Sequence, residues 1–279
     1  MLKRILMHLL LRRMLAAPAV QRVLFHTLVA AMLVFLLAPV ILVIPMSFSA
    51  DRVLMWPPSG FSLKWYAQIA NERGLIEAAR NSLVLAVIVT AATLAISLPA
   101  ALAIDRWRFA GRDAILALLT APLLLPTIVL ALALLIIFVG YGLLGTWIGL
   151  MLAHMLVTLP YGIRVLSTSL STLPASVEEA AASLGAPPSA VFRRITLPLM
   201  VPGLVATCAI VFLVSFDEVV ISLFLVGPQL TTLPVALFRY VESRTDPLVA
   251  AVSTLLVVFS LAIVLVLDRA VGLRRAVGK

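Results

Sequence analysis

Two adjacent carboxylates interrupt a long apolar stretch. Asp217 and Glu218 lie within the run from about Gly203 to Val226, which otherwise holds no acidic or basic residue. A charged side chain at the centre of a membrane-spanning helix costs about 2.5–3.5 kcal/mol on insertion scales, so such groups normally face a bundle interior, a cavity or a partner. Two interpretations are open: at least one acid attracts a cationic solute, or the acids are structural, paired to another helix or subunit or lying at the water boundary.

Other residue types that commonly do chemistry lack the spacing that catalysis or metal binding needs. Cys208 is the only cysteine, so neither an internal disulfide nor a cysteine zinc cluster is available. His8, His26 and His154 are far apart, and His154 is expected to be a satisfied interior group rather than a proton relay. The patterns GxxxxGK(S/T), HExxH and GxSxG are absent. We therefore expect a chain that is not an enzyme and holds no metal or cofactor of its own.

The composition indicates a membrane protein. Of the 279 residues, 63% are hydrophobic and 12% are charged, and the mean hydropathy is +1.18; soluble domains are about 45–50% apolar and about 25% charged. The net charge of +9 suggests nucleic-acid binding in a soluble protein, but in a membrane protein it indicates loops that face anionic lipid. We expect an all-α polytopic protein with six transmembrane helices, from about Phe25 to Met46, Ser82 to Ile104, Ala114 to Val139, Leu143 to Arg164, Gly203 to Val226 and Leu248 to Leu267.

Polar residues and prolines mark the ends and interiors of these segments. Asn81 and Ser82 are expected to cap the start of the second helix with their side-chain oxygens. Pro122, Pro126 and Pro160 fall inside apolar runs, where a buried membrane bundle tolerates a kink. The prolines therefore predict bent but continuous helices, with a functional hinge as the alternative.

Basic residues are unevenly divided between the two sides of the predicted bundle. Fifteen of the 21 lysines and arginines lie before the first segment, after the sixth, or in the loops that follow the second and fourth. The positive-inside rule then predicts that both termini are cytoplasmic. Residues 2–15 are amphipathic, which suits a helix lying on the inner leaflet. We expect a cytoplasmic segment at residues 1–24 and one transmembrane domain at residues 25–279.

The long loop at about residues 167–202 predicts two short helices separated by a sharp break. Ser176 and Glu179 have the spacing of a capping box, and small alanines follow them. Gly185 can adopt the left-handed conformation that ends a helix, and Pro187 prevents the helix from continuing.

A second short helix is expected from about Ser189 to Pro198. It carries an apolar stripe of Val191, Phe192 and Ile195, which needs a partner groove. Because small side chains allow close approach and the stripe is unpartnered, we interpret the two helices as a docking element for another protein.

This loop also contains separated positions with a fixed spacing. Intervals of three, nine and one residues separate the parts of the set Glu179, Ala180, Ala181, Gly185, Ile195, Leu197 and Pro198. The pattern resembles the EAA loop of the membrane-spanning subunits of bacterial ATP-binding-cassette (ABC) importers. Its position between the fourth and fifth of six segments also fits. The resemblance implies the fold of a type I ABC importer permease.

In that family the EAA loop inserts a coupling helix into a cleft on a separate ATPase. The resemblance therefore implies an ABC ATPase dimer that binds the ATP and Mg, a second and different permease subunit, and a periplasmic solute-binding protein. It implies a place in the bacterial inner membrane, in contact with lipid and without a nucleic-acid partner. The residues implied in ATPase coupling are Glu178, Glu179, Ala180, Ala181, Gly185, Ile195, Leu197 and Pro198.

Other residues resemble the second permease of spermidine/putrescine importers. The matching stretches are Trp65-Tyr66, Asn81-Ser82, Ser215 to Val220, Gly227-Pro228 and Thr231 to Pro234. The resemblance implies a polyamine solute, with Asp217 and Glu218 in its pathway. Permeases for opines, aminophosphonates or amino-acid derivatives share much of the pattern and stay open as alternatives. An ion-driven secondary carrier and a non-transporting membrane scaffold are more distant ones.

Overall fold

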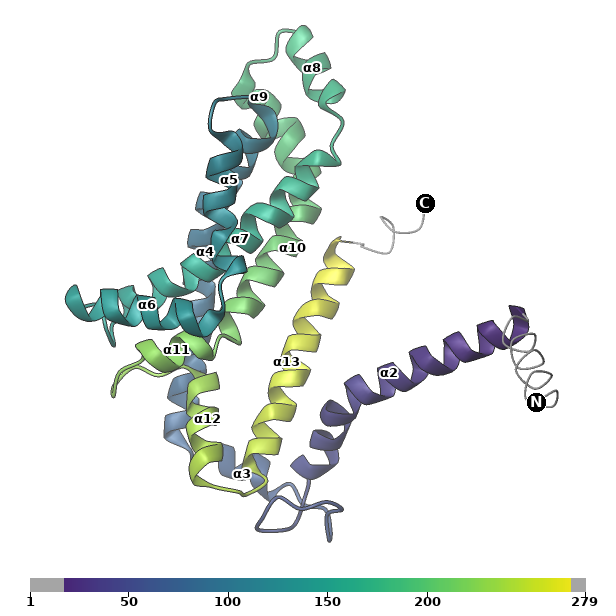
Figure 1. Ribbon diagram of the computed structural model, residues 1–279, viewed down its shortest axis with the longest axis vertical. Helices are drawn as coiled ribbons and strands as arrows, with labels where there is room; N and C mark the ends of the chain where they lie inside the picture. Colours follow the sequence, from purple (N-terminus) through teal and green to yellow (C-terminus); the bar gives the residue numbers. More distant parts are fainter. Residues whose placement is uncertain (1–17, 272–279) are drawn as a thin grey trace, which may run out of the picture. The chain divides into compact units, whose positions relative to one another are not determined.

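Helices form the regular structure of residues 18–271, the part of the chain that the computed structural model describes (Figure 1). Between these residues there are two isolated β-bridges and no strand, so the all-α prediction is confirmed. The predicted amphipathic helix at residues 2–15 lies outside the described residues. The elements are α2 (Pro18–Ser47), α3 (Lys64–Ile69), α4 (Arg73–Arg106), α5 (Arg112–Thr120), η1 (Ala121–Leu124), α6 (Thr127–Gly140), α7 (Trp147–Ser171), α8 (Ala175–Ser183), α9 (Pro188–Val191), η2 (Phe192–Thr196), α10 (Leu197–Phe216), α11 (Val220–Leu225), α12 (Leu233–Ser243) and α13 (Leu248–Val271).

The chain divides into two compact units, which we describe separately. Of the described residues, 18–66 and 246–254 belong to the first unit, and 67–245 and 255–271 belong to the second. The predicted coupling loop and both intramembrane acids fall in the second unit.

Five stretches of the described chain are helical, long and apolar enough to cross a membrane. A sixth is counted if a bent pair of helices forms one span. Five of the six predicted segments overlap these stretches, and the third corresponds to the bent pair. The five stretches are Gln21–Ser47, Arg73–Arg106, Trp147–Ser171, Pro188–Phe216 and Leu248–Val266.

The third segment was expected to be one continuous helix, and this is wrong. The helical run that ends at Leu124 and the one that begins at Thr127 are bent by 103°. Pro126 lacks a backbone N–H, and its ring disfavours the helical conformation at Leu125, which is extended (φ −91°, ψ 139°). The break lies at this proline, whereas Pro160 remains inside α7.

The fifth segment is also divided, contrary to its predicted extent from Gly203 to Val226. α10 ends at Phe216, where the backbone N–H of Asp217 donates to the carbonyl oxygen of Leu213 at 2.9 Å. The next helix, α11, begins only at Val220. The two acids therefore lie in a break between helices rather than within one.

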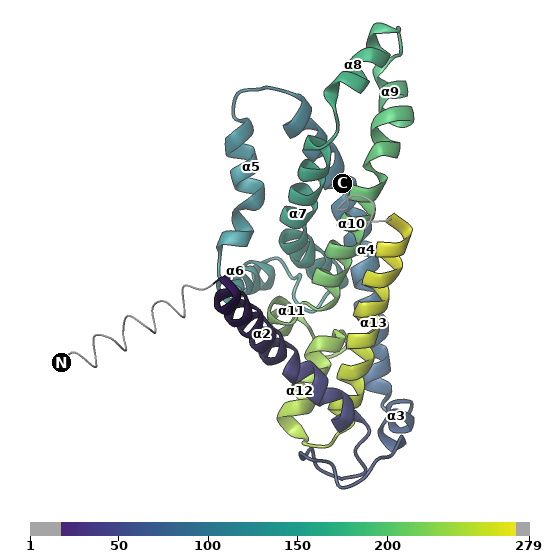
Figure 2. The ribbon, with the colours of Figure 1, turned by 90° about the vertical axis from the view of Figure 1, so that its right-hand side faces the viewer.

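Three helices of the second unit, α4, α7 and α10, lie side by side (Figures 1 and 2). A Cβ atom on Gly162 of α7 would lie 2.8 Å from the Oγ of Ser97 on α4. A Cβ atom on Gly203 of α10 would collide with the side chain of Ser169 on α7. The two glycines thus allow the close backbone approach on which packing between membrane helices depends.

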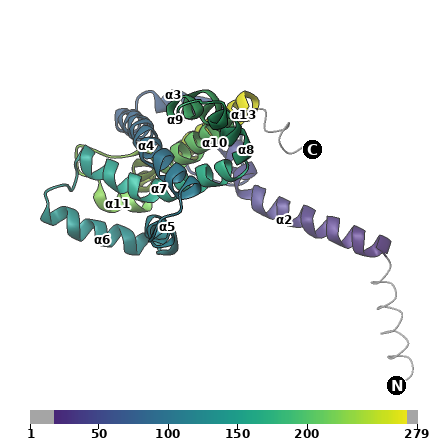
Figure 3. The same ribbon diagram turned by 90° about the horizontal axis from the view of Figure 1, so that it is seen from above.

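The bent half of the third segment, α6, packs beside α11 (Figure 3). Their contact contains buried Ala131, Leu134 and Phe138 from α6 and buried Ile221 and Leu225 from α11. This apolar cluster holds α6 in place at the bend.

The loop after α2, in the first unit, is tied down by hydrogen bonds. The indole N–H of buried Trp65 donates to the carbonyl oxygen of Ser49 at 2.9 Å. The carboxylate of Asp51 accepts from the hydroxyl and backbone N–H of Ser59 and from the hydroxyl of Ser49. The side-chain and backbone hydrogen bonds of Ser59 are the main reason that the pKa of Asp51 is lowered from its usual 3.8.

Asn81 and Ser82 lie inside α4, so their predicted capping of that helix is wrong. α4 begins at Arg73, because its polar first turns extend beyond the apolar run that marked the predicted start. Ser82 instead accepts a hydrogen bond from the backbone N–H of Leu233 at 2.8 Å, and the Asn81 amide donates to the carbonyl oxygen of Thr231 at 3.1 Å. The two side chains hold the start of α12 against α4.

Candidate functional site

The first helix of the predicted docking element is α8, which is not capped as expected. Pro174 is its N-cap residue, and no side chain accepts a capping hydrogen bond there. Ser176 therefore does not act as the cap, because α8 already begins at Ala175. Glu178 lies in the first turn, where the helix dipole favours a negative charge.

The turn after α8 has the predicted glycine geometry. Gly185 has φ +85°, a left-handed conformation that favours glycine. Its N–H donates to Ala182 at 2.9 Å, and the N–H of Ala186 donates to Ala181 at 3.1 Å. These bonds form a Schellman motif, which satisfies the last carbonyl groups of α8. The turn leaves the side chain of Leu184 89% exposed at its tip.

The second helix of the docking element does not stop near Pro198, contrary to expectation. α9, η2 and α10 form one helical stretch from Pro188 to Phe216, and Pro198 lies inside this stretch, near the start of α10. η2 is a π-helical insertion at Phe192–Thr196. Such insertions are rare and occur frequently at functional sites. The docking element is therefore continuous with a membrane-spanning helix.

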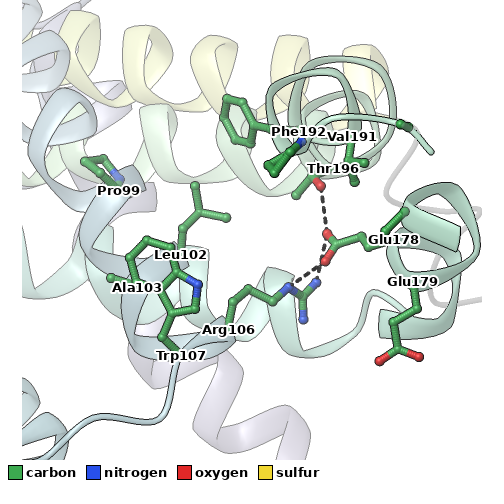
Figure 4. A pocket seen from close by; sticks show the side chains of 13 residues that line it. Pro99, Leu102, Ala103, Arg106, Trp107, Glu178, Glu179, Val191, Phe192 and Thr196 are labelled. Atoms are coloured by element: carbon green, nitrogen blue, oxygen red, sulfur yellow. Dashed lines mark hydrogen bonds and ion pairs between the residues drawn. The ribbon is translucent and has the colours of Figure 1, made fainter.

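A cluster of polar side chains joins α8 to two other elements (Figure 4). The Arg106 guanidinium at the end of α4 forms an ion pair with Glu178 at 2.9 Å and a second contact at 3.2 Å. The Thr196 hydroxyl of η2 donates to the same carboxylate at 2.7 Å. We call Arg106, Glu178 and Thr196 the polar clamp. It connects α8 to η2 in the same loop and to α4, which is distant in sequence.

A groove of about 730 Å³ lies beside the polar clamp, between the end of α4 and the hairpin formed by α8 and α9, which we call the docking hairpin. Leu102 of α4 and the following Trp107 form part of one wall, and Val191 and Phe192 form part of the other (Figure 4). Two residues of the predicted apolar stripe thus face a groove whose opposite wall belongs to the same chain.

The residues implied in coupling divide into exposed and half-buried groups. The side chain of Glu179 is directed away from the polar clamp (Figure 4). The exposed residues are Glu179, Ala180, Gly185 and Pro198, and the half-buried ones are Glu178, Ala181, Ile195 and Leu197.

The two intramembrane acids differ in their surroundings. Glu218 is half-buried, and its carboxylate accepts from the backbone N–H of Ile221 at 3.0 Å, which caps α11. The side chain of Asp217 is exposed in this single chain, and within residues 18–271 no hydrogen bond or ion pair to its carboxylate is found. The acids are therefore adjacent in sequence but different in their ability to accept a ligand.

His154 lies behind this break and is a satisfied interior group, as predicted. Its side chain is 1% exposed. Nδ1 lies 3.0 Å from the hydroxyl of Ser215 on α10, and Nε2 lies 2.9 Å from the hydroxyl of Ser222 on α11. Since each hydroxyl can donate or accept, either imidazole tautomer satisfies both contacts.

The two candidate regions lie at opposite ends of α10. Pro198 and Asp217 are separated by about 28 Å along the helix at 1.5 Å per residue. α10 therefore provides one rigid element between the docking hairpin and the acid at the break.

Comparison with known sequences decides the family. Residues 93–274 match the model of the family described as "Binding-protein-dependent transport system inner membrane component". The chain belongs to this permease family. Such a permease is a multi-pass protein of the bacterial inner membrane, and the matched region contains the docking hairpin, all three residues of the polar clamp and both acids.

Several characterised permeases are similar over most of this permease. The spermidine/putrescine transport system permease protein PotC of Haemophilus influenzae is 35% identical over 232 residues, covering 82% of this chain and 89% of PotC. PotC of Escherichia coli K12 is 36% identical, covering 84% and 89%. The putrescine transport system permease protein PotI of the same strain is 33% identical, covering 80% and 81%.

Solved structures show the same fold. A bacterial alginate ABC transporter chain, from a complex with an alginate-bound periplasmic protein, matches with a TM-score of 0.66 and 17% identity, covering 91% of this permease and 96% of that chain. A chain of the MetNI methionine ABC transporter matches with a TM-score of 0.59 and 20% identity, covering 71% and 94%. The type I importer permease fold predicted from the EAA pattern is thus confirmed.

Two residues of the polar clamp were missing from the predicted site. Arg106 was counted only among the charges that set orientation, and Thr196 occupies the variable position between Ile195 and Leu197. Nothing local marks either residue, because their common partner Glu178 lies 72 positions from Arg106 and 18 positions from Thr196. The serine partners of His154 were missed for the same reason.

Proposed function

We propose that this permease forms half of the membrane pathway of an ATP-driven importer for putrescine, spermidine or a related polyamine. The observation that carries the proposal is the 33–36% identity, over 80–84% of the chain, to permeases named for spermidine/putrescine or putrescine transport. Polyamines are flexible polycations, and their amines require acceptors when they leave water.

The docking hairpin is the proposed site of ATPase coupling. Its exposed residues Glu179, Ala180 and Gly185 contact the ATPase, and the half-buried Glu178 positions them through the polar clamp. Ile195, Leu197 and Pro198 return the chain to α10. An ABC ATPase dimer on separate chains binds ATP and Mg, and this chain performs no hydrolysis.

The proposed assembly contains two further partners. A second, different permease subunit completes the pathway, and a periplasmic solute-binding protein delivers the solute. The docking hairpin and both termini are cytoplasmic in this arrangement, as the basic-residue distribution predicts. Reporter fusions at residue 279 and in the loop at Pro228 test the orientation, since the two reporters must lie on opposite sides.

Uptake of radiolabelled putrescine and spermidine by the complete transporter tests the function. Wild-type permease is expected to support ATP-dependent uptake, and Gly185→Pro or Glu179→Lys is expected to abolish it while the assembly remains in the membrane. Uptake that persists without ATP, driven by an ion gradient, would instead support a secondary carrier.

A second solute class is favoured by another relative. The osmoprotective compounds uptake permease protein GgtD of Synechocystis is 30% identical over 187 residues, covering 66% of this chain. ATPase activity coupled to the permease without polyamine uptake would support a small organic solute of this kind, or an opine, aminophosphonate or amino-acid derivative.

A further inference from the structure

We infer that Asp217, rather than Glu218, is presented to a cationic solute, and that His154 is a positioning residue for Asp217. The identity of the solute rests on the proposed function. The division of roles between the acids rests on the geometry of the helix break.

The break between α10 and α11 is held from both sides by one side chain. His154 contacts Ser215, two residues before Asp217, and Ser222, four residues after Glu218. A ring that bridges both flanks limits how far the two helices can rotate or separate. The backbone that carries Asp217 is therefore fixed by a buried group on a third helix.

His154 is itself anchored within the bundle. The Thr158 hydroxyl lies 2.9 Å from the carbonyl oxygen of His154 and 2.8 Å from the hydroxyl of Thr93 on α4. Both threonines are fully buried. These bonds tie the α7 backbone at His154 to α4, and the imidazole of the same residue contacts both sides of the helix break; fully satisfied buried networks are rigid.

At the break, the Glu218 carboxylate accepts a structural hydrogen bond, and the Asp217 carboxylate is available to a ligand. Glu218 caps α11 through Ile221, so binding a solute would require it to give up that structural hydrogen bond. Asp217 has no such competing role among the described residues. A carboxylate that faced lipid without a partner would be strongly disfavoured, so Asp217 faces the solute pathway or a partner group.

A cation is the ligand that fits this acid. A carboxylate without a proton accepts hydrogen bonds only, and an ammonium group donates three and accepts none. Putrescine and spermidine, the solutes named for PotC and PotI, end in such ammonium groups. These permeases provide an observation independent of the break geometry.

The first experiment measures putrescine uptake by the complete transporter over a range of concentrations. Asp217→Asn is expected to raise KM about tenfold or more, because a charge-assisted hydrogen bond is lost. Glu218→Gln keeps an oxygen that can cap α11 and is expected to change KM much less. Thr207→Val on α10 is the control, since the hydrogen bond that the described residues give this buried hydroxyl lies within its own helix, to the carbonyl oxygen of Gly203.

The positioning role of His154 requires a non-additive effect on KM. His154→Leu is expected to raise KM with normal amounts of assembled transporter, and to add little when combined with Asp217→Asn. His154→Gln can donate and accept and is expected to restore much of the affinity. Additive KM effects, or a loss of maximal rate alone, would assign His154 to general stability and overturn the inference.

The second experiment does not depend on the solute. In a Cys208→Ala background, a cationic methanethiosulfonate reagent is expected to modify the Asp217→Cys variant at least about tenfold faster than the Glu218→Cys variant, because a thiolate reacts according to its access. Adding His154→Leu is expected to reduce that difference. Equal rates would overturn the division of roles. Failure of polyamine uptake together with unequal rates would instead reject only the proposed solute.

Discussion

The polar clamp allows a quantitative prediction about how the docking hairpin is held. The side chains of Arg106 and Glu178 are 22% and 20% exposed, so their ion pair is neither fully buried nor on the surface. Exposed pairs contribute about 0–1 kcal/mol, and removing one partner of a buried pair costs about 3–5 kcal/mol. We therefore expect Arg106→Met to destabilise the permease by about 2 kcal/mol. Thr196→Val removes one hydrogen bond to a carboxylate and is expected to cost about 1–2 kcal/mol.

Thermal unfolding and transport coupling measure this effect. A loss of about 2 kcal/mol corresponds to a decrease in Tm of about 4–8 °C for a protein of this size. In proteoliposomes with the partner subunits, Arg106→Met is also expected to lower the solute imported per ATP hydrolysed, because α8 can move without moving α4. Arg108→Met is the matched control, since Arg108 is exposed and lies near the same helix end.

Two results would refute the clamp. One is an Arg106→Met variant with the Tm and coupling ratio of Arg108→Met. The other is full additivity of Arg106→Met and Glu178→Gln, because residues that act through one contact are non-additive. The exchange of Arg106→Glu with Glu178→Arg is expected to recover only part of the loss, since Asp105 lies 3.0 Å from the native guanidinium and would repel the new glutamate.

Three further predictions concern glycine packing, the turn after α8 and the loop after α2. Gly162→Ala is expected to destabilise by about 1–3 kcal/mol in thermal unfolding, because its Cβ would overlap Ser97; Ser97→Gly should relieve the loss, and Gly140→Ala, which meets open space, should be neutral. Gly185→Ala is expected to cost about 1–2 kcal/mol from its left-handed conformation and to lower uptake, with the asparagine variant less affected; equal losses for both variants would argue against a conformational cause. Asp51→Asn is expected to lower Tm at pH 6 and to lower it progressively less as the pH falls below 3.8, because the lowered pKa of Asp51 stabilises the fold above the unfolded value of about 3.8 and this contribution is lost as the pH falls through the folded value; a Tm difference that does not change with pH would contradict this account.

The sequence predicted the features of this fold that depend on residues close together in the chain. Apolar runs located the helices α2, α4, α7 and α13, and the left-handed turn at Gly185 followed from a glycine before a proline. The same reasoning failed at Pro126, because Pro160 is chemically identical and stays helical. What differs is the surroundings: α6 has α11 beside it, and that contact stabilises the broken form.

The functional residues also divide into those marked by a local sequence pattern and those brought together only by the fold. The spacing of the EAA pattern marks the docking hairpin, since its positions are close in sequence. The polar clamp and the contacts of His154 join residues 61–72 positions apart, apart from the contact of Thr196 with Glu178. A single sequence contains no signal for such pairs, because either member is an ordinary choice in its own segment.

The packing of α6 against α11 constrains the order in which the permease is completed during synthesis. α6 has 14 residues, or about 21 Å of helix, which is shorter than the roughly 30 Å hydrocarbon core. The buried face of α6 contacts residues 221 and 225. At about 5–20 residues per second, these two residues are synthesised several seconds after α6. A nascent chain arrested before residue 220 therefore contains a third segment whose bent half still lacks the α11 part of its apolar contact.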